Sequence, residues 1–180
     1  MTLPAGWTEV ALGDVAEFKY GKSLSAGTRS GSGWGVYGSN GQVGQHDLAL
    51  THGPTVIIGR KGSCGEVHWS SDPCWPIDTT YYVDEESKTA DLRWLMYRLR
   101  GLGLTQLNRA AAIPGLNRDD AYRCAMLFPP LAEQRRIAAI LDKADGLRAK
   151  RRAALAQLDA LSQAVFLDMF RRPGHQPDGL

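Results

Sequence analysis

Leu131-Ala-Glu-Gln-Arg-Arg-Ile137 begins a run of residues that continues to Phe170 without a proline and with a single glycine, Gly146. Alanine, leucine, arginine and glutamine dominate the run, and these residues lose little free energy on entering a helix. The run therefore predicts one helix over residues 131–170, about 55–60 Å long at about 1.5 Å per residue. Residues 171–180 contain prolines and glycines and predict a flexible tail.

Apolar or small side chains recur along this run with gaps of alternately three and four residues, the spacing of a and d positions in a coiled coil. The positions are Ile137, Ile140, Ala144, Leu147, Ala154, Leu158, Leu161 and Val165, and the charged Arg151 breaks the pattern. We call this set the seam. One apolar stripe cannot bury itself on a single helix, so the seam predicts a dimerisation and spacer helix that packs against a second copy or another chain.

The composition of the 180-residue chain is typical of a folded domain in water, with 43% hydrophobic and 22% charged residues. We expect one domain over residues 1–130, followed by the helix. No apolar stretch is long enough to cross a bilayer, and the first residues do not resemble a signal peptide, so a cytoplasmic protein is expected. The three cysteines show no CxxC spacing, which favours reduced thiols and no metal site.

The charges nearly balance, with 21 Lys and Arg residues against 19 Asp and Glu residues and a net charge of +2. A general binder of polyanions would be more basic. If the chain binds nucleic acid, it must do so through side chains placed at defined positions.

Residues 1–130 predict an α/β (α+β) domain with a mixed, twisted β-sheet and short helices. Thr55-Val-Ile-Ile-Gly-Arg60 is rich in β-branched residues and predicts a buried strand. Glu66-Val-His-Trp69 predicts a strand that returns beside it, and Trp75-Pro-Ile-Asp-Thr-Thr-Tyr-Tyr-Val83 predicts another. An amphipathic helix is expected over residues 91–100.

Residues 36–44 predict a hairpin, because Asn40-Gly41 is a two-residue turn signal in which both residues take positive φ. Ser39, Asn40 and Gln42 would lie at its tip. The tip is either a plain turn or an element that reads DNA, since Asn and Gln can each form two hydrogen bonds with adenine in the major groove.

Gly59-Arg-Lys-Gly-Ser-Cys-Gly65 lacks the Gly-Lys-Ser/Thr spacing of a phosphate-binding P-loop. It predicts a tight turn that needs its glycines for conformational reasons. A basic pair on such a turn can also approach the DNA backbone closely. Arg60, Lys61 and Ser63 are therefore candidate DNA contacts.

Two further loops supply candidate DNA contacts. Residues 21–35, rich in glycine and serine, carry Lys22 and Arg29, and the region around residues 107–118 carries Arg109, Asn117 and Arg118. Each loop is either a solvated surface or a recognition surface, because loops on a rigid scaffold often carry binding residues.

Catalytic and metal-binding patterns are weak. His46, His52 and His68 lie at no ligand spacing with the cysteines. Asp78 lies within a predicted strand, and no nucleophile–base pair is visible around it. With neither a dinucleotide fingerprint nor a methyltransferase motif, we expect no catalysis and no cofactor in this chain.

The order of these motifs resembles the specificity (S) subunit of type I restriction–modification systems. The resemblance reaches nearly to Phe170 and is carried by Gly53-Pro-Thr-Val-Ile-Ile-Gly-Arg-Lys-Gly-Ser-Cys-Gly65, Ala111-Ala-Ile-Pro-Gly-Leu-Asn117 and Phe128-Pro-Pro-Leu-Ala-Glu-Gln-Arg-Arg-Ile137. Its most specific part is Pro129-Pro-Leu-Ala-Glu-Gln134 running into a long helix.

The resemblance implies that residues 1–130 form a target recognition domain that reads one half of a bipartite site in double-stranded DNA. The usual subunit carries two such units and this chain carries one, so a half-subunit that pairs with a second copy of itself is expected. Two identical readers would face an interrupted palindromic site. Methylation would come from a partner modification subunit that binds S-adenosylmethionine, and cleavage from a partner restriction subunit.

Two other functions stay open from the sequence. The chain could be a coiled-coil interaction subunit of another phage-defence assembly, in which the helix binds protein and the first domain does not bind DNA. A small hydrolase built on Asp78 and His68 is the third reading, and it would need a turnover assay.

Overall fold

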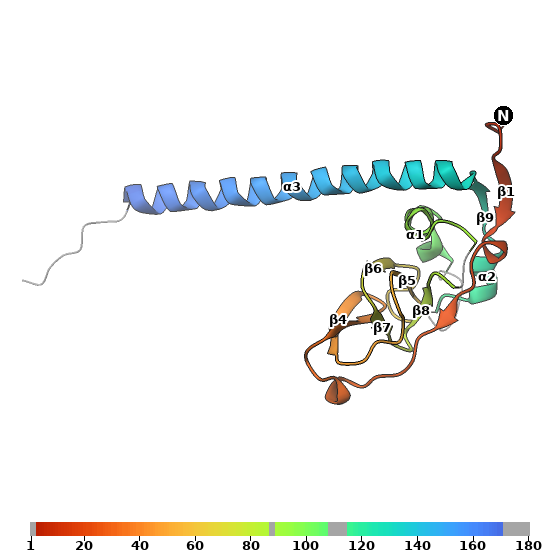
Figure 1. The fold of residues 1–180 in the computed structure, drawn as a ribbon. Helices are drawn as coiled ribbons and strands as arrows, with labels where there is room; N and C mark the ends of the chain where they lie inside the picture. The colour runs from red at the N-terminus through yellow and green to blue at the C-terminus, as the bar shows by residue number, and fades with distance from the viewer. Residues whose placement is uncertain (1–2, 87–88, 108–114, 171–180) are drawn as a thin grey trace, which may run out of the picture. The chain divides into compact units, whose positions relative to one another are not determined.

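The computed structural model describes residues 3–86, 89–107 and 115–170, and the chain divides into two compact units between Ala138 and Ala139. Figure 1 shows the order of the elements. The strands are β1 (Thr8–Ala11), β2 (Lys19–Tyr20), β3 (Trp34–Gly38), β4 (Gly41–His46), β5 (Thr55–Gly59), β6 (Val67–Ser70), β7 (Cys74–Pro76), β8 (Thr80–Val83) and β9 (Ala125–Phe128). The α-helices are α1 (Leu92–Arg100), α2 (Arg118–Tyr122) and α3 (Leu131–Phe170), and short 3-10 turns occur at η1 (Leu12–Asp14), η2 (Ala26–Thr28) and η3 (Leu104–Gln106).

The described strands form three small sheets. β2, β8, β5 and β6 form an antiparallel sheet in that order, and β1 pairs antiparallel with β9. The third sheet has the order β4-β3-β7 and contains one parallel pair, β3 with β7. The predicted α+β class, with mixed strand pairing, short helices and a long C-terminal helix, is confirmed, although the strands are shared among three sheets.

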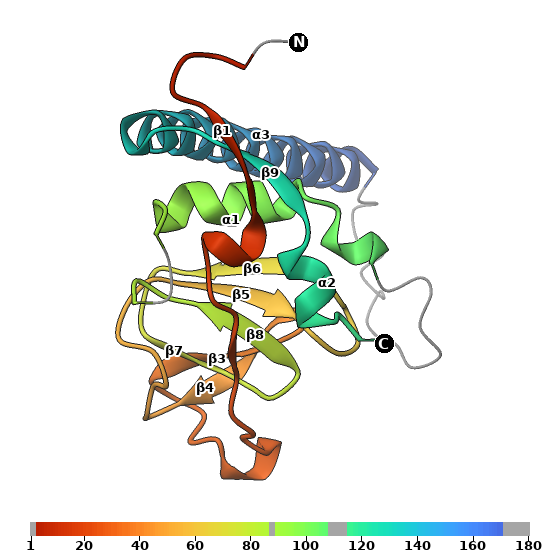
Figure 2. The same ribbon diagram turned by 90° about the vertical axis from the view of Figure 1, so that its right-hand side faces the viewer.

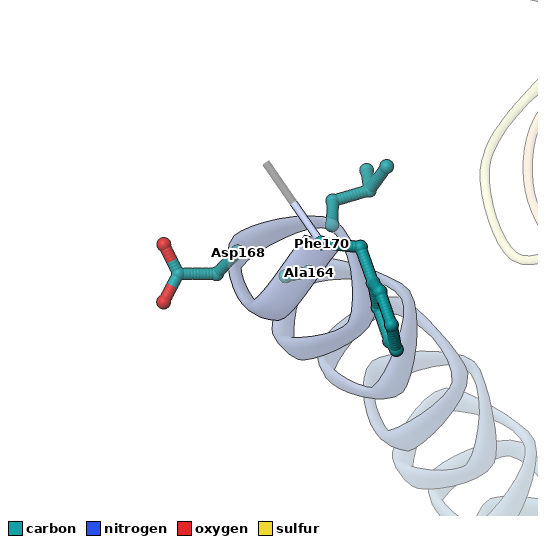
Figure 3. Close-up of a pocket in the computed structure, with 4 residues that line it drawn as sticks. Ala164, Asp168 and Phe170 are labelled. Atoms are coloured by element: carbon teal, nitrogen blue, oxygen red, sulfur yellow. The ribbon is translucent and has the colours of Figure 1, made fainter. Parts of the chain in front are cut away.

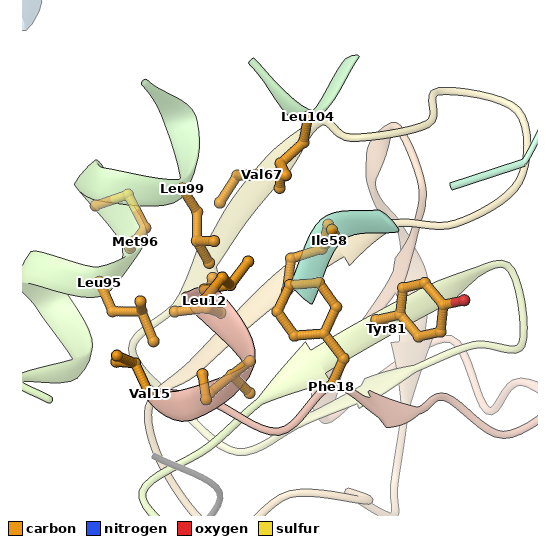
Figure 4. Packing of buried hydrophobic residues seen from close by; sticks show 14 of the residues in the cluster. Leu12, Val15, Phe18, Ile58, Val67, Tyr81, Leu95, Met96, Leu99 and Leu104 are labelled. Atoms are coloured by element: carbon orange, nitrogen blue, oxygen red, sulfur yellow. The ribbon is translucent and has the colours of Figure 1, made fainter. Parts of the chain in front are cut away.

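Strand β5 lies at the centre of the first unit, as its β-branched sequence predicts. All five of its residues are buried, and it pairs antiparallel with β6 on one side and β8 on the other. Helix α1 covers this sheet (Figure 2). Its buried residues Leu95, Met96 and Leu99 belong to the same core as Ile58 and Phe18 (Figure 4).

The prediction of one strand over residues 75–83 is wrong. The chain forms β7 in one sheet and β8 in another, joined by a turn in which both the N–H and the hydroxyl of Thr80 donate to the Ile77 carbonyl, at 3.0 and 2.7 Å. Pro76 lacks an N–H and ends β7. The Ile77 N–H then donates to the Tyr37 carbonyl at 2.9 Å, which keeps the turn against β3.

The predicted hairpin forms, but its turn differs from the expected one. Gly38 pairs with Gly41, so the two loop residues are Ser39 and Asn40. Of the tip residues only Gly41 has a positive φ, at 113°, and Asn40 does not. A register shift between Val36 and Tyr37 accompanies this turn and changes the strand geometry that Asn-Gly alone would suggest.

Helix α3 has the predicted bounds, and its first two turns belong to the first compact unit, which ends at Ala138. The Gln134 side chain is 1% exposed. Its Oε1 accepts from the Asp91 N–H and its Nε2 donates to the Pro129 carbonyl, both at 2.8 Å. The first compact unit therefore includes the start of α3 as well as residues 1–130.

Beyond Ala138, most of the seam is exposed along α3. The side chains of Ile140, Leu147, Leu158, Leu161 and Val165 are between 48% and 68% exposed. Ala154 is exposed and Ala144 is half-buried, whereas Ile137 packs partly against the core of the first unit. In the described part of the chain, no helix is both long enough and apolar enough to span a membrane. Residues 171–180, the predicted tail, lie outside the described ranges.

Candidate nucleic-acid interface

Three loop segments singled out by the sequence lie together beside the end of β5. A Cβ atom added at Gly62 would be 3.3 Å from the hydroxyl of Ser39, so the turn after β5 touches the hairpin tip. The Leu116 N–H donates to the Arg60 carbonyl at 2.8 Å, which ties the segment before α2 to the same turn. Gln42 lies beyond the hairpin tip on β4, where its Nε2 atom donates to the Gly44 carbonyl at 3.3 Å. We call the residues of these segments, together with Gln42, the basic end: Ser39, Asn40, Gln42, Arg60, Lys61, Ser63, Asn117 and Arg118.

The backbone of the turn is held by its own hydrogen bonds. The N–H groups of Arg60 and Lys61 both donate to the Thr79 carbonyl, at 2.9 and 3.1 Å. Gly65 has φ of 78° and its N–H donates to the Gly59 carbonyl at 2.8 Å. The glycines therefore have the conformational role that the sequence suggested, and the N–H groups of Arg60 and Lys61 do not form a phosphate cradle. This turn therefore offers an anion its side chains, and that of Lys61 is exposed.

The guanidinium group of Arg60 is fixed in place. Its Nε and Nη2 atoms donate to the Asp78 carbonyl oxygen at 3.2 and 2.7 Å. Its Cζ atom lies 5.3 Å from the ring centroid of Tyr20 and 5.9 Å from that of Tyr81. An arginine held in this way needs little further ordering before it contacts a ligand.

Arg118 lies at the start of α2, where Asn117 is the N-cap residue. The side-chain oxygen of Asn117 accepts from the N–H groups of Asp119 and Asp120 at 2.8 and 3.4 Å, which leaves its amide NH₂ for other contacts. The Cζ atom of Arg118 lies 5.4 Å from the centroid of Tyr20 and 5.8 Å from that of Tyr122. The basic end thus holds two arginines beside aromatic rings.

Tyr81 supports this arrangement from the core. Its hydroxyl donates to the Leu116 carbonyl at 3.1 Å. Burial, followed by its contact with Tyr20, raises the pKa of Tyr81 to about 12 although two arginines nearby act in the opposite direction. Tyr81 is therefore neutral at physiological pH and keeps the proton that it donates.

Lys22 and Arg29 are not brought into the basic end by any contact that the described residues make. The Nη1 and Nη2 atoms of Arg29 donate to the carbonyls of Val43 and Leu24, at 2.8 and 3.3 Å, which anchors its loop to β4. The backbone of Lys22 is bound to the residues of β7, and its side chain is exposed. Arg109 lies outside the described residues. The assignment of all three to DNA binding stays a prediction.

The groups considered for catalysis are used elsewhere. His68 Nε2 is 3.1 Å from the Ser39 carbonyl and 3.7 Å from a Glu66 carboxylate oxygen. The backbone carbonyl of Asp78 accepts from Arg60, and no nucleophile–base pair forms around Asp78 among the described contacts. Within the described ranges, no three His, Cys, Asp or Glu side chains come together as metal ligands.

The end of α3 carries a surface depression of about 450 Å³ whose lining residues, among those that the structure describes, all belong to this helix and include Ala164, Asp168 and Phe170 (Figure 3). A second phenyl ring, Phe166, lies 4.6 Å from that of Phe170, centroid to centroid. None of the residues predicted to bind DNA lies among those that line it.

All eight residues of the basic end are candidates from the sequence, whereas Tyr20, which contacts two of them, is not. It is half exposed on a strand of two residues, and no motif marks it. The contacts with Arg60 and Arg118 depend on residues far apart in the sequence, so only the folded arrangement reveals them.

Comparison with known proteins identifies the family. The model of the type I restriction modification DNA specificity domain matches residues 4–157. Three solved structures share the fold: the type I S subunit from M. genitalium (19% identity, TM-score 0.70), a chain from a study of complex assembly and conformational transition of the type I R-M system (23%, 0.72), and the HsdS subunit from Thermoanaerobacter tengcongensis (24%, 0.64).

These structural matches cover 89%, 92% and 95% of this chain, but only 45%, 45% and 46% of the matched chains. The chain therefore spans a little under half the length of each. The comparison with curated proteins gave no match. With the fold, the long helix and the family model in agreement over most of its length, this chain belongs to the family of type I restriction–modification DNA specificity domains.

Proposed function

We propose that this chain is a non-catalytic specificity subunit whose single target recognition domain binds double-stranded DNA through the basic end. The observation that carries the proposal is the family match over residues 4–157, which contain the whole basic end. The near balance of charge fits recognition by a few placed side chains. Lys61 and the two arginines suit phosphate oxygens, and Asn40 and Gln42 suit base edges.

The second part of the proposal is a homodimer formed along the seam. The seam exposes five large apolar side chains on one helix, and such an area is normally covered by a partner. The chain also corresponds to a little under half of the matched subunits, so two copies would supply two recognition domains. Two-fold symmetry then favours an interrupted palindromic site.

In this proposal the chemistry lies in partner subunits. A modification subunit that carries S-adenosylmethionine would methylate the bound site, and a restriction subunit would cleave DNA. This chain would contribute the choice of site.

Charge reversal tests the DNA-binding part. The double variant Arg60→Glu, Lys61→Glu should bind duplex DNA at least about tenfold more weakly than the wild type. The negative slope of log affinity against log salt concentration should become shallower by roughly two. The control is Lys143→Glu, Lys150→Glu, which makes the same charge change on exposed positions of α3. Fluorescence anisotropy over a salt series measures both. Unchanged DNA affinity in the first variant would favour the alternative, a protein-binding interaction subunit.

A further inference from the structure

Tyr20 links the two arginines of the basic end. Its ring centroid lies 5.3 Å from the Arg60 Cζ atom and 5.4 Å from the Arg118 Cζ atom, and the side chain is 50% exposed. An aromatic ring attracts a cation to its face, and the attraction is larger where water is partly excluded. Both arginines are half-buried here.

The Tyr20 ring is itself fixed by a row of aromatic side chains that reaches into the core. It packs edge-on against Tyr81, with centroids 5.1 Å apart and an interplanar angle of 63°. Tyr81 packs against Phe18 at 5.7 Å, and Phe18 against Tyr122 at 5.5 Å. Arg118 contacts both ends of this row, Tyr20 and Tyr122. The position of the exposed ring is therefore set by buried neighbours.

The arginines keep hydrogen-bond donors for a ligand. The Asp78 carbonyl occupies the Nε and Nη2 atoms of Arg60, while Nη1 has no acceptor among the residues that the structure describes. Over the same residues, the guanidinium group of Arg118 makes ring contacts and no hydrogen bond to protein. A guanidinium group held by its face presents its N–H groups at the edge, where a phosphate can accept two of them.

We propose that Tyr20 is a positioning residue that holds Arg60 and Arg118 so that both donate to phosphate oxygens of the DNA backbone. Two like charges beside one ring repel each other, and an anion between or beside them relieves that repulsion. A phosphate group carries a full charge, whereas a neutral base edge does not. This inference rests on the proposed function, because it assumes that the basic end contacts DNA.

The test compares Tyr20→Leu with Tyr20→Phe. The phenylalanine variant keeps the ring face and should bind duplex DNA as the wild type does. The leucine variant should bind roughly threefold to thirtyfold more weakly. The loss should be equal on a duplex selected from a random pool and on a shuffled duplex of the same composition, because phosphates carry no sequence information. Circular dichroism and thermal melting check that both variants are folded.

A double-mutant cycle separates positioning from direct contact. If Tyr20 acts through Arg60 and Arg118, Tyr20→Leu should cost little further affinity in a chain that already carries Arg60→Ala and Arg118→Ala. Additive losses, an equal loss in Tyr20→Phe, a loss confined to the selected duplex, or no loss in Tyr20→Leu would each overturn the inference. If the Arg60, Lys61 reversal weakens binding while Tyr20→Leu does not, only the inference fails. If neither the charge reversal nor Tyr20→Leu weakens DNA binding, the proposed function fails.

Discussion

Gln134 shows how one side chain joins a helix to a domain. Its amide is almost fully buried, and both ends of that amide are used, by the Asp91 N–H and by the Pro129 carbonyl. A buried amide without partners costs free energy, so the two bonds are a condition for placing glutamine there. The sequence Pro129-Pro-Leu-Ala-Glu-Gln134 thus has a structural explanation, because it starts α3 and ties the first turn of that helix to Asp91, the N-cap residue of α1.

Replacing Gln134 by leucine should destabilise the first unit. The Asp91 N–H and the Pro129 carbonyl would lose their partners, at about 1–3 kcal/mol for each buried group left unpaired. Urea unfolding followed by tryptophan fluorescence gives the free energy of unfolding. Gln157→Leu, on an exposed position of α3, is the matched control and should leave it nearly unchanged. Equal stability of the two variants would contradict the explanation.

Tyr81 should make stability depend on pH in the alkaline range. Its native pKa is raised to about 12, above the value of about 10 in an unfolded chain. Between these values the native state holds a proton that the unfolded state has released, so stability falls as pH rises from about 10 to 12. Tyr81→Phe should show a shallower fall, although burial also raises the pKa of the neighbouring Tyr82. Unfolding curves over this range measure the slope, and identical slopes would contradict the assignment.

At the scale of elements, the turn between β5 and β6 depends on Gly59. A Cβ atom there would lie 2.0 Å from the Ser63 carbonyl oxygen, which is backbone and cannot move aside cheaply. Gly59→Ala should therefore cost about 1–3 kcal/mol or more. Gly27→Ala is the control, since nothing lies within 4 Å of its Cβ position. Thermal melting compares the two, and a Gly59 variant as stable as the Gly27 variant would contradict this account.

Elements with strong local signals could be predicted from the sequence. The β-branched run Thr55–Gly59 is the central strand, and Asp91 caps α1 by accepting from the Trp94 N–H at 2.9 Å. Residues 75–83 predict a single strand, and that prediction is wrong, because the residues of β7 and β8 both favour strands and nothing in the local sequence separates them. Their division depends on pairing with β3 on one side and β5 on the other, which local sequence does not encode.

In the candidate site too, local signals could be predicted from the sequence, whereas tertiary neighbours could not. Arg60 and Lys61 could be found because glycines mark their turn. Their position beside Ser39 and Arg118 is a tertiary property, and so is the use of the Arg29 guanidinium by two carbonyls of its own surroundings. A list of polar loop residues drawn from the sequence therefore includes some, such as Arg29, whose side chains hold a loop in place.

At the scale of the whole molecule, the proposed dimer makes a sharp prediction. Leu158→Glu places a charge in the middle of the apolar seam and should raise the dimer dissociation constant by about tenfold or more. Ala156→Glu makes the same charge on a residue of α3 outside the seam and should have little effect. Sedimentation equilibrium over a concentration series measures both. A wild-type chain that stays monomeric at high concentration while α3 remains helical would end the proposal.

Helix α3 is one unbroken element from Leu131 to Phe170, and this constrains how its length could vary. Inserting one residue would turn the downstream half of the seam by about 100° and shift it by about 1.5 Å along the axis. Seven inserted residues would restore the phase to within about 20° while adding about 10.5 Å. Eleven inserted residues would do the same while adding about 16.5 Å. Relatives that keep a continuous stripe should therefore differ in helix length by such increments, so that in the proposed dimer the distance between the two recognition domains would change in discrete steps.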